Sequence, residues 1–319
     1  MSHRTEVLII GAGVSGLTTA ACLADSGIRV RILTAKLPEN TTSAVAGALI
    51  GGQVTGEPDD PATAWNKDSL AEFTTLADVP GSGVHVARGR MVMRTGDGVP
   101  AWSRALPAFA VCTLEEAAGY PVAFWFESPV VDMPRYLGYL TERVAAAGVV
   151  IDVEPVASLP DLAGSAAVVV NCTGLGSREL AGDERVAPVR GQHVIVENPG
   201  LREFFYERGS GPTLTSFIPH GDRLVLGGTV ERGDVRTEAD PVQAAEIVGR
   251  CAVVEPRIAT AAITGVDVGL RPGRGGVRLE LDQIQGVRVV HNYGHAGIGV
   301  ALSWGCANHV TRLVRSTLA

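Results

Sequence analysis

The chain has 319 residues and a net charge of −7, and its lysines and arginines form no basic run. Nucleic acid is therefore not an expected partner, while the length allows two domains or one large α/β domain with an insertion. The five cysteines are scattered without a CxxC pair, which predicts free thiols in a reducing compartment and neither a disulfide framework nor a metal site.

The apolar run near the N-terminus predicts a buried strand and helix rather than a signal peptide. Glu6 stands where a signal peptide needs a positive flank, and glycines interrupt the run. No segment approaches the ~20 apolar residues of a membrane span, and the last residues, RSTLA, are not a peroxisomal signal. We therefore expect a cytoplasmic protein without a membrane partner.

The first motif is a glycine turn between a strand and a helix. Residues 7–10 form a continuous apolar run typical of a buried parallel strand, and Gly11, Gly13 and Gly16 follow with the spacing G-x-G-x-x-G. The first glycine permits a tight turn, the second lets a pyrophosphate approach the backbone, and the third lets helix and strand pack closely. Because a second strand follows at 28–33, the motif has the context that predicts a dinucleotide site.

The carboxylate that usually binds the cofactor's ribose is missing. It should end the second strand, where the chain has Thr34 and Ala35. The next residue, Lys36, would suit a 2′-phosphate, so this part of the sequence leaves nicotinamide and flavin cofactors both open.

The rest of the chain alternates between nucleotide-binding and β-rich segments. The small-residue loop NTTSAVAGAL (40–49) suits a phosphate or a ring, residues 166–180 form a buried strand and a glycine turn, and residues 289–307 form a strand, a glycine-rich turn and a helix. Helical spacing occurs at 61–77, 134–147 and 241–253, and β-rich runs occur at 84–94, 122–131, 186–197 and 223–230. This order predicts a discontinuous cofactor domain interrupted by a substrate domain. No second dinucleotide motif is present, which favours a tightly held flavin over an exchanging nicotinamide.

Several segments together resemble the family of D-amino-acid oxidase and D-aspartate oxidase. VLIIGAGVSGL resembles the family's N-terminal fingerprint, VVVNCTGLGSREL its central strand and turn, PVRGQHVIVENP the start of its substrate-domain sheet, and FIPHGDRLVLGGTVERGD a hairpin over its active site. GVDVGLRPGRGGVRLE resembles the segment with the carboxylate-binding arginine, and HNYGHAGIGVALSWGCA fits the family's most specific signature.

The resemblance implies a fold and a cofactor. The expected fold is α/β, with a Rossmann-like FAD-binding domain over 1–78, 134–183 and 265–319 and an antiparallel β-rich substrate domain over 79–133 and 184–264. The FAD is expected to be held non-covalently. Its expected contacts come from the glycine turn, the 40–49 loop, two strand ends and the last turn: Gly11, Gly13, Val14, Ser15, Gly16, Lys36, Thr41, Thr42, Ser43, Gly47, Ala48, Leu49, Val156, Thr173, Gly174, Ala296, Gly297, Ile298, Gly299, Val300 and Ala301.

The substrate contacts implied by the resemblance centre on Arg271. A planar guanidinium can hold a substrate α-carboxylate with two hydrogen bonds, whereas Arg274 and Arg278 are expected in ion pairs. Gly297 is expected to place its backbone beside the flavin and the substrate. The family's chemistry needs no general base, so His291 and His295 are interpreted as residues of the turn.

The chain departs from the family around the expected pocket. Ser216 occupies the place of an active-site tyrosine, and Gly51, Gly52 and Val54 replace bulky residues. One interpretation is an enlarged pocket for a different or bulkier substrate. The other is drift without a larger pocket, in which Ser216 (as a substrate contact) or a water replaces the phenol, or the lid loop folds inward and Tyr206 or Phe217 supplies what the missing phenols supplied.

The function implied by the resemblance is FAD-dependent oxidative deamination of D-amino acids. A hydride passes from Cα to flavin N5, O2 is reduced to H2O2, and the imino acid hydrolyses to keto acid and ammonia. The expected partners are a small D-amino acid and O2, and a homodimer is one assembly that the sequence leaves open. The alternatives are an amine oxidase of a modified, bulky, biosynthetic or glycine/sarcosine-type substrate, a flavin-binding protein without turnover, and an NAD(P)-dependent dehydrogenase.

Overall fold

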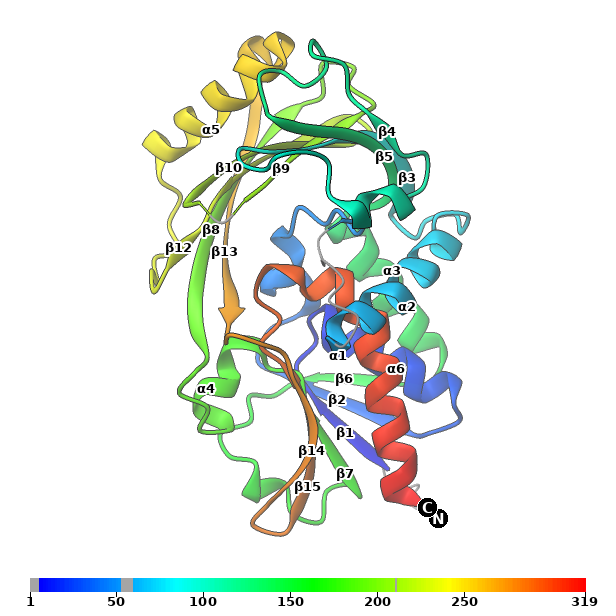
Figure 1. Cartoon of the computed structure of the whole chain (residues 1–319). Helices are drawn as coiled ribbons and strands as arrows, with labels where there is room; N and C mark the ends of the chain where they lie inside the picture. The colour runs from blue at the N-terminus through cyan, green and yellow to red at the C-terminus, as the bar shows by residue number, and fades with distance from the viewer. Residues whose placement is uncertain (1–5, 53–59, 210) are drawn as a thin grey trace.

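The computed structural model describes residues 6–52, 60–209 and 211–319. The chain forms one six-stranded and one nine-stranded sheet, which lie in the lower and upper halves of the molecule in Figure 1. It begins in the six-stranded sheet, leaves it twice to build the nine-stranded sheet, and returns to it each time. This path produces the discontinuous arrangement predicted from the sequence, and the mixed α/β fold is confirmed.

The six-stranded sheet has the order β14-β15-β7-β1-β2-β6, and all neighbouring pairs are parallel except β14 and β15. Its central strand is apolar on both sides: Val7 and Ile9 face one core cluster, and Leu8 and Ile10 face another. The strands are β1 (Val7–Ile10), β2 (Val30–Thr34), β6 (Val150–Val153), β7 (Val168–Asn171), β14 (Arg278–Ile284) and β15 (Val287–Tyr293).

Four helices share the core on one side of this sheet. Leu17, Phe73, Leu140 and Val310, one from each helix, are all fully buried in the same cluster as Val7 and Ile9. These helices are α1 (Val14–Asp25), α2 (Pro61–Leu76), α3 (Met133–Ala146) and α6 (Gly299–Leu318). The segment after β6 and the short helix α4 (Ser177–Leu180) pack on the opposite side.

The nine-stranded sheet is antiparallel except for the pair β3 and β9. Its order is β12-β8-β11-β10-β9-β3-β5-β4, and β13 pairs with β8. The strands are β3 (Val84–Met93), β4 (Ala110–Val111), β5 (Val122–Val131), β8 (Ala187–Glu197), β9 (Phe204–Arg208), β10 (Thr213–His220), β11 (Arg223–Thr229), β12 (Glu231–Arg232) and β13 (Ile263–Gly273).

The two faces of this sheet have different partners. Val194 and Leu226 point to the outer face, where Ile247 of α5 (Pro241–Val254) covers them. Met91 and Phe204 point to the inner face, the side that carries the residues described below. Short 3-10 helices connect the elements: η1 (Pro38–Asn40), η2 (Thr42–Val45), η3 (Ala101–Ala105), η4 (Pro160–Leu162), η5 (Gly174–Gly176), η6 (Pro256–Thr260) and η7 (Ala296–Ile298).

The three long helices expected from spacing are present, each within one residue of its predicted ends. One boundary needs correction. Residues 265–273 were assigned to the FAD-binding part, but they lie in β13, which pairs with β8 along its length in the nine-stranded sheet. The chain rejoins the six-stranded sheet at β14. The apolar alternation of a strand does not reveal which sheet it joins, so the sequence could not place this boundary.

The five cysteines are free thiols, as expected. Burial raises the pKa of Cys22, Cys172 and Cys251 to about 12 and that of Cys112 to about 11. Burial also raises the pKa of Cys306.

The contact between α2 and α6 depends on Gly305. A Cβ there would stand 2.2 Å from the Trp65 carbonyl oxygen, whereas a Cβ on Gly138 of α3 would meet nothing within 4 Å. We predict that Gly305→Ala lowers the free energy of unfolding by about 1–3 kcal/mol through overpacking. Gly138→Ala should raise it by roughly 0.5–1 kcal/mol through helix propensity. Urea unfolding of both variants checks this, and a shift of the same sign in both would contradict it.

Candidate functional site

The G-x-G-x-x-G turn is built from close backbone contacts. Gly11 has φ of +104°, and a Cβ there would stand 2.6 Å from the Cys172 carbonyl oxygen. A Cβ on Gly16 would stand 1.9 Å from the Gly11 carbonyl oxygen. Neither position accepts a side chain, so the helix lies directly against the strand as the motif predicts.

The N-terminus of α1 opens toward a loop of hydroxyl groups. Gly13 is the N-cap, and a Cβ there would lie 3.1 Å from Ser43 Oγ and 3.8 Å from Thr41 Oγ1. Ser43 Oγ accepts a hydrogen bond from the Val14 N–H at 3.0 Å. N–H groups of a first helical turn, with the helix dipole behind them, favour an anion at this place. The cradle fits a dinucleotide pyrophosphate, because it is bare of side chains at Gly13 and bordered by hydroxyls.

At the end of β2, where the chain lacks the ribose-binding carboxylate, Thr34 provides a hydroxyl instead. The buried Thr34 Oγ1 accepts from the Ala12 N–H at 3.2 Å and donates to the Lys36 carbonyl at 2.8 Å. Thr34 therefore stabilises the glycine turn itself, and it cannot replace an acidic ligand of the ribose. Ala35 and Lys36 are exposed beside it.

Other predicted cofactor residues follow the ends of neighbouring strands. Thr173, after β7, donates from its backbone N–H and its hydroxyl to Asn171 Oδ1 at 3.1 and 2.7 Å, and Gly174 follows with φ of +56°. Val156, after β6, packs against the cluster under these ends. The carboxyl ends of β1, β2, β6 and β7 thus share one edge, which is where ligands bind in doubly wound sheets.

The last predicted segment joins this edge through the turn after β15. His291 and His295 are buried; His291 Nδ1 lies 3.4 Å from Asn171 Nδ2, and His295 Nε2 lies 3.1 Å from Asn292 Oδ1. Their partners lie within the fold, in line with their interpretation as turn residues. Ala296 and Gly297 are exposed in η7, Ile298 and Gly299 are half-buried, and Val300 and Ala301 are buried in the first turn of α6.

Arg271 lies where β13 meets this turn. A Cβ on Gly297 would stand 3.5 Å from Arg271 Cδ, and a Cβ on Gly191 would overlap the guanidinium at 2.1 Å from Nη1. Nη1 donates to the carbonyls of Arg190 and Thr229 at 3.3 and 3.1 Å. These two bonds use both Nη1 protons, so the Nε–Nη2 edge remains for a planar acceptor such as a carboxylate.

Arg271 differs from its arginine neighbours in its charge environment. Arg274 pairs with Asp183 at 2.6 Å, and Arg278 pairs with Glu280 and Asp282, as expected from the sequence. Within the described residues no carboxylate forms an ion pair with Arg271, and burial lowers the pKa of its guanidinium. A half-buried cation without an anion is costly, so this position favours an anionic ligand.

Two further residues lie on the same inner face: His193, to which no sequence motif assigned a role, and Tyr206, one of the two candidates for the missing phenols. His193 pairs with Gly227, Gly227 with Ser216, and Ser216 with Tyr206, so these side chains point to one side of the sheet. The Tyr206 phenol also acts on the pKa of Arg271, opposing the effect of burial. Strand alternation from Ser216 could have identified Tyr206 once the pairing of β9 with β10 was known.

The imidazole of His193 is held in one tautomer. Its Nδ1 donates to the Val45 carbonyl at 3.2 Å, since a carbonyl can only accept, and Nε2 is therefore an acceptor. Burial and the charge of Arg271 lower the pKa of His193 to about 4, so it is neutral at pH 7. This bond also ties β8 to the loop that holds Thr42, Gly47 and the other predicted cofactor residues. In this loop Thr42 Oγ1 bonds the Leu270 carbonyl at 3.3 Å.

The space around Gly51 and Gly52, which one of the two interpretations assigned to an enlarged pocket, is filled. A Cβ on Gly51 would stand 2.8 Å from Ser128 Oγ, and one on Gly52 would stand 2.5 Å from Met91 Cε. Side chains of β3 and β5 fill the space that these glycines leave. Leu49 and Ala48, on the same segment, lie against β5 through a bridge to Val130 and a bond to Val131. Val54 lies outside the described residues.

Phe217 does not face the site. It points to the outer face and stacks on Phe205 with ring centroids 5.3 Å apart. Of the two aromatic residues considered as replacements for the missing phenols, only Tyr206 lies on the inner face.

Among residues 6–52, 60–209 and 211–319, no group of three histidines, cysteines or carboxylates could hold a metal ion. No helix in that part of the chain is long and apolar enough to cross a membrane.

Comparison with known proteins adds three findings. A family model described as FAD dependent oxidoreductase matches residues 6–313. The chain is 45% identical over 313 residues to a D-amino-acid oxidase of Streptomyces coelicolor, covering 97% of this chain and 96% of that protein. It is 40% identical over 317 residues to a D-amino-acid oxidase of Rubrobacter xylanophilus, covering 98% and 97%.

A solved structure shows the same fold. Glycine oxidase from Geobacillus kaustophilus matches with a TM-score of 0.82 and 20% identity, covering 99% of this chain and 95% of that chain.

The buried histidines predict a pH dependence of stability. Burial lowers the pKa of His193, His291 and His295 to about 4, and charge from Arg271 and Arg278 adds to this for the first two. An unfolded histidine titrates near pH 6.5, so between about pH 6.5 and 4 the unfolded chain binds more protons than the folded protein. The free energy of unfolding therefore decreases as the pH is lowered through this range. We expect the free energy of unfolding of His295→Gln to fall by up to about 3 kcal/mol less than that of the wild type over this range. Urea unfolding at pH 7, 6, 5 and 4.5 measures both curves; identical slopes would contradict the prediction.

Proposed function

Because the chain belongs to the FAD-dependent oxidoreductase family that includes the D-amino-acid oxidases, we propose that it oxidises D-amino acids with O2. The family match and the full-length relatives confirm the resemblance inferred from the sequence motifs. FAD is the cofactor, and the enzyme is an oxidoreductase. The observation that supports a carboxylate substrate is Arg271: a half-buried cation without a carboxylate partner in the described residues, with one donor edge open beside Gly297.

The chain's residues fit FAD at the edge shared by the parallel strands. We propose that the first turn of α1, with Gly13, Val14 and Ser15, holds the pyrophosphate, and that the 41–49 loop and the turn at 296–301 border the ring. Thr34 supplies no carboxylate for the ribose, so the ribose must be held by other groups. When bound, FAD accepts the substrate's Cα hydride and passes the electrons to O2, which yields H2O2. The binding is proposed to be non-covalent.

The protein's own part in the reaction is to bind and orient the substrate. Arg271 receives the α-carboxylate on its Nε–Nη2 edge, and the Tyr206 phenol lies on the same face within electrostatic range of that guanidinium. His193 stays neutral, so it adds no second positive charge beside the carboxylate site. The substrate would react as the neutral amine, its ammonium proton having passed to water, and the released imino acid would hydrolyse in water to keto acid and ammonia. A homodimer and a cytoplasmic location stay predictions.

The test is peroxide release from the purified holoenzyme over D-alanine, D-methionine, D-aspartate, L-alanine, glycine and sarcosine. We expect turnover of D-amino acids, and a loss of roughly 2–5 kcal/mol in transition-state binding for Arg271→Lys, because lysine keeps the charge without the two-pronged donor. The loss should appear in kcat/KM. Arg278→Lys, which changes an arginine that is paired with Glu280 and Asp282, is the matched control.

Two results would overturn these assignments separately. Yellow, folded protein that oxidises glycine or sarcosine but no D-amino acid would replace the proposed substrate. Arg271→Ala with kcat/KM within twofold of wild type would remove the proposed carboxylate site.

Tyr206 and Ser216 distinguish the two interpretations of the pocket. We expect Tyr206→Phe to lower kcat/KM for D-alanine about 10-fold, since hydrogen bonds to charged groups contribute about 1.5–3 kcal/mol. Ser216→Tyr should gain no activity and should destabilise by about 1–3 kcal/mol, because the ring would enter space already occupied around His193. Tyr120→Phe, whose hydroxyl bonds Glu207, is the control. Improved D-alanine turnover by Ser216→Tyr would restore the enlarged-pocket interpretation.

A further inference from the structure

The Thr229 carbonyl that holds Arg271 belongs to a β-bulge. His193 of β8 pairs with Gly227 of β11, and Arg190 of β8 pairs with Glu231 of β12. Between these two pairs β8 spans three residue steps and the opposing chain spans four, so the opposing chain has one extra residue. In the bulge the Gln192 N–H donates to the Thr229 side chain at 3.0 Å instead of to a strand carbonyl. The Thr229 carbonyl is thereby left to accept the Arg271 Nη1–H at 3.1 Å.

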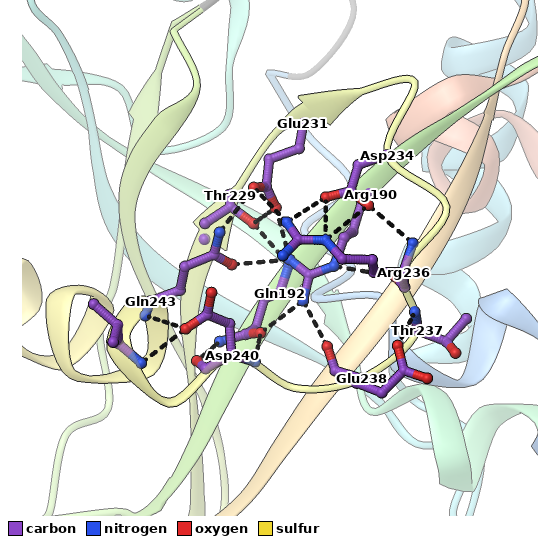
Figure 2. Close-up of polar contacts among 12 residues, drawn as sticks. Arg190, Gln192, Thr229, Glu231, Asp234, Arg236, Thr237, Glu238, Asp240 and Gln243 are labelled. Carbon is purple, nitrogen blue, oxygen red and sulfur yellow. Dashed lines mark hydrogen bonds and ion pairs between the residues drawn. The ribbon is translucent and has the colours of Figure 1, made fainter.

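A polar cluster on the outer face holds the bulge in place (Figure 2). Its centre is Arg190, which is fully buried and donates all five of its N–H groups. Nη1 donates to Glu231 at 2.6 Å and to Gln243 at 2.8 Å, and Nη2 donates to Gln192 at 3.0 Å. We call these four residues the Arg190 cluster.

The cluster extends along the segment after the bulge. Nη2 and Nε of Arg190 donate to the carbonyls of Glu238 and Arg236 at 2.8 and 3.1 Å, and Gln192 exchanges two hydrogen bonds with the backbone of Asp240. Gln243 Nε2 donates to the second oxygen of Glu231 at 2.8 Å. The whole connection from β12 to α5 is thus fastened to β8 directly behind Arg271.

A buried ion pair of this kind is weak evidence for stability, since apolar residues of similar volume often serve as well. It does fix geometry, because each partner is bonded in several directions at once. The backbone of Arg190 itself accepts from Arg271 Nη1 at 3.3 Å. Both carbonyls that fix the Arg271 guanidinium therefore belong to, or are held by, the Arg190 cluster.

We propose that the Arg190 cluster is a positioning device for Arg271, which fixes the guanidinium plane through the Arg190 and Thr229 carbonyls so that the Nε–Nη2 edge faces the substrate carboxylate. This inference rests on the proposed function and names the residues that set its carboxylate affinity. Arg190 itself touches no substrate.

The test compares Arg190→Lys and Thr229→Val with wild type, all as FAD-loaded protein. The probe is benzoate, a carboxylate without an amine, titrated by calorimetry. We expect the benzoate Kd and the KM for a D-amino acid to rise ~10-fold in each folded variant, with kcat within about threefold, since the change acts on carboxylate binding. The FAD Kd should stay at the wild-type value. Arg94→Lys, which alters an ion pair with Glu207 of β9 and lies outside the Arg190 cluster, should leave the benzoate Kd unchanged.

The outcomes separate positioning from a purely structural role. A lower melting temperature with an unchanged benzoate Kd in a folded variant would overturn the proposal, as would a wild type that does not bind benzoate. If Arg190→Lys fails to fold, Thr229→Val decides, because it removes only the hydroxyl that accepts from Gln192. The turnover of D-amino acids by the wild type is measured in a separate assay, which tests the proposed function and not the positioning of Arg271. A wild type that binds benzoate through Arg271 but oxidises no D-amino acid would end the proposed function and leave the positioning of Arg271 testable by the same titration.

Discussion

The site depends on one strand of the nine-stranded sheet whose end reaches the ligand-binding edge of the six-stranded sheet. β13 pairs with β8 over its length in the nine-stranded sheet, and its far end reaches the turn before α6 (Figure 1). Arg271 stands near that end, so a side chain of one sheet meets the ligand-binding edge of the other. The contact is possible because glycines stand around it: Gly191 lies under the guanidinium and Gly297 beside its stem, while Gly269 faces Val45. Any side chain at Gly191 would have to displace the guanidinium.

Electrostatic pairing separates structural arginines from the one at the site. Arg190, Arg274 and Arg278 each form an ion pair with a carboxylate, which neutralises their charge within the fold. Arg271 has backbone carbonyls instead, which orient it without neutralising it. Its charge is therefore available to a ligand. Burial, and after it the charge of Arg271, lowers the pKa of the adjacent His193, which stays neutral beside the guanidinium.

Much of this arrangement could be predicted from the sequence because it follows local rules. The glycine turn and the helices each sit in a short pattern whose spacing has a physical cause, whereas Arg271 was implied by the resemblance of its segment to the family's. Tyr206 and Phe217 are both candidates from the sequence, and only the pairing of β9 with β10 shows that Tyr206 is the one that faces the same side as Ser216. Gly51 and Gly52 suggested empty space, but long-range packing from Met91 and Ser128 fills it. The bulge at Thr229 likewise appears only when two strands are paired.

The buried thiols acquire a meaning from the proposed reaction. An oxidase of this kind releases H2O2 within its own structure, and peroxide attacks thiolates rather than thiols. With pKa values of about 11 to 12, Cys22, Cys112, Cys172 and Cys251 stay protonated at neutral pH. The thiolate fraction is then only on the order of one part in ten thousand or less, against about 3% for an ordinary exposed cysteine. The fold thus keeps its cysteines in the form least sensitive to the oxidant it makes, and self-inactivation should proceed through other side chains.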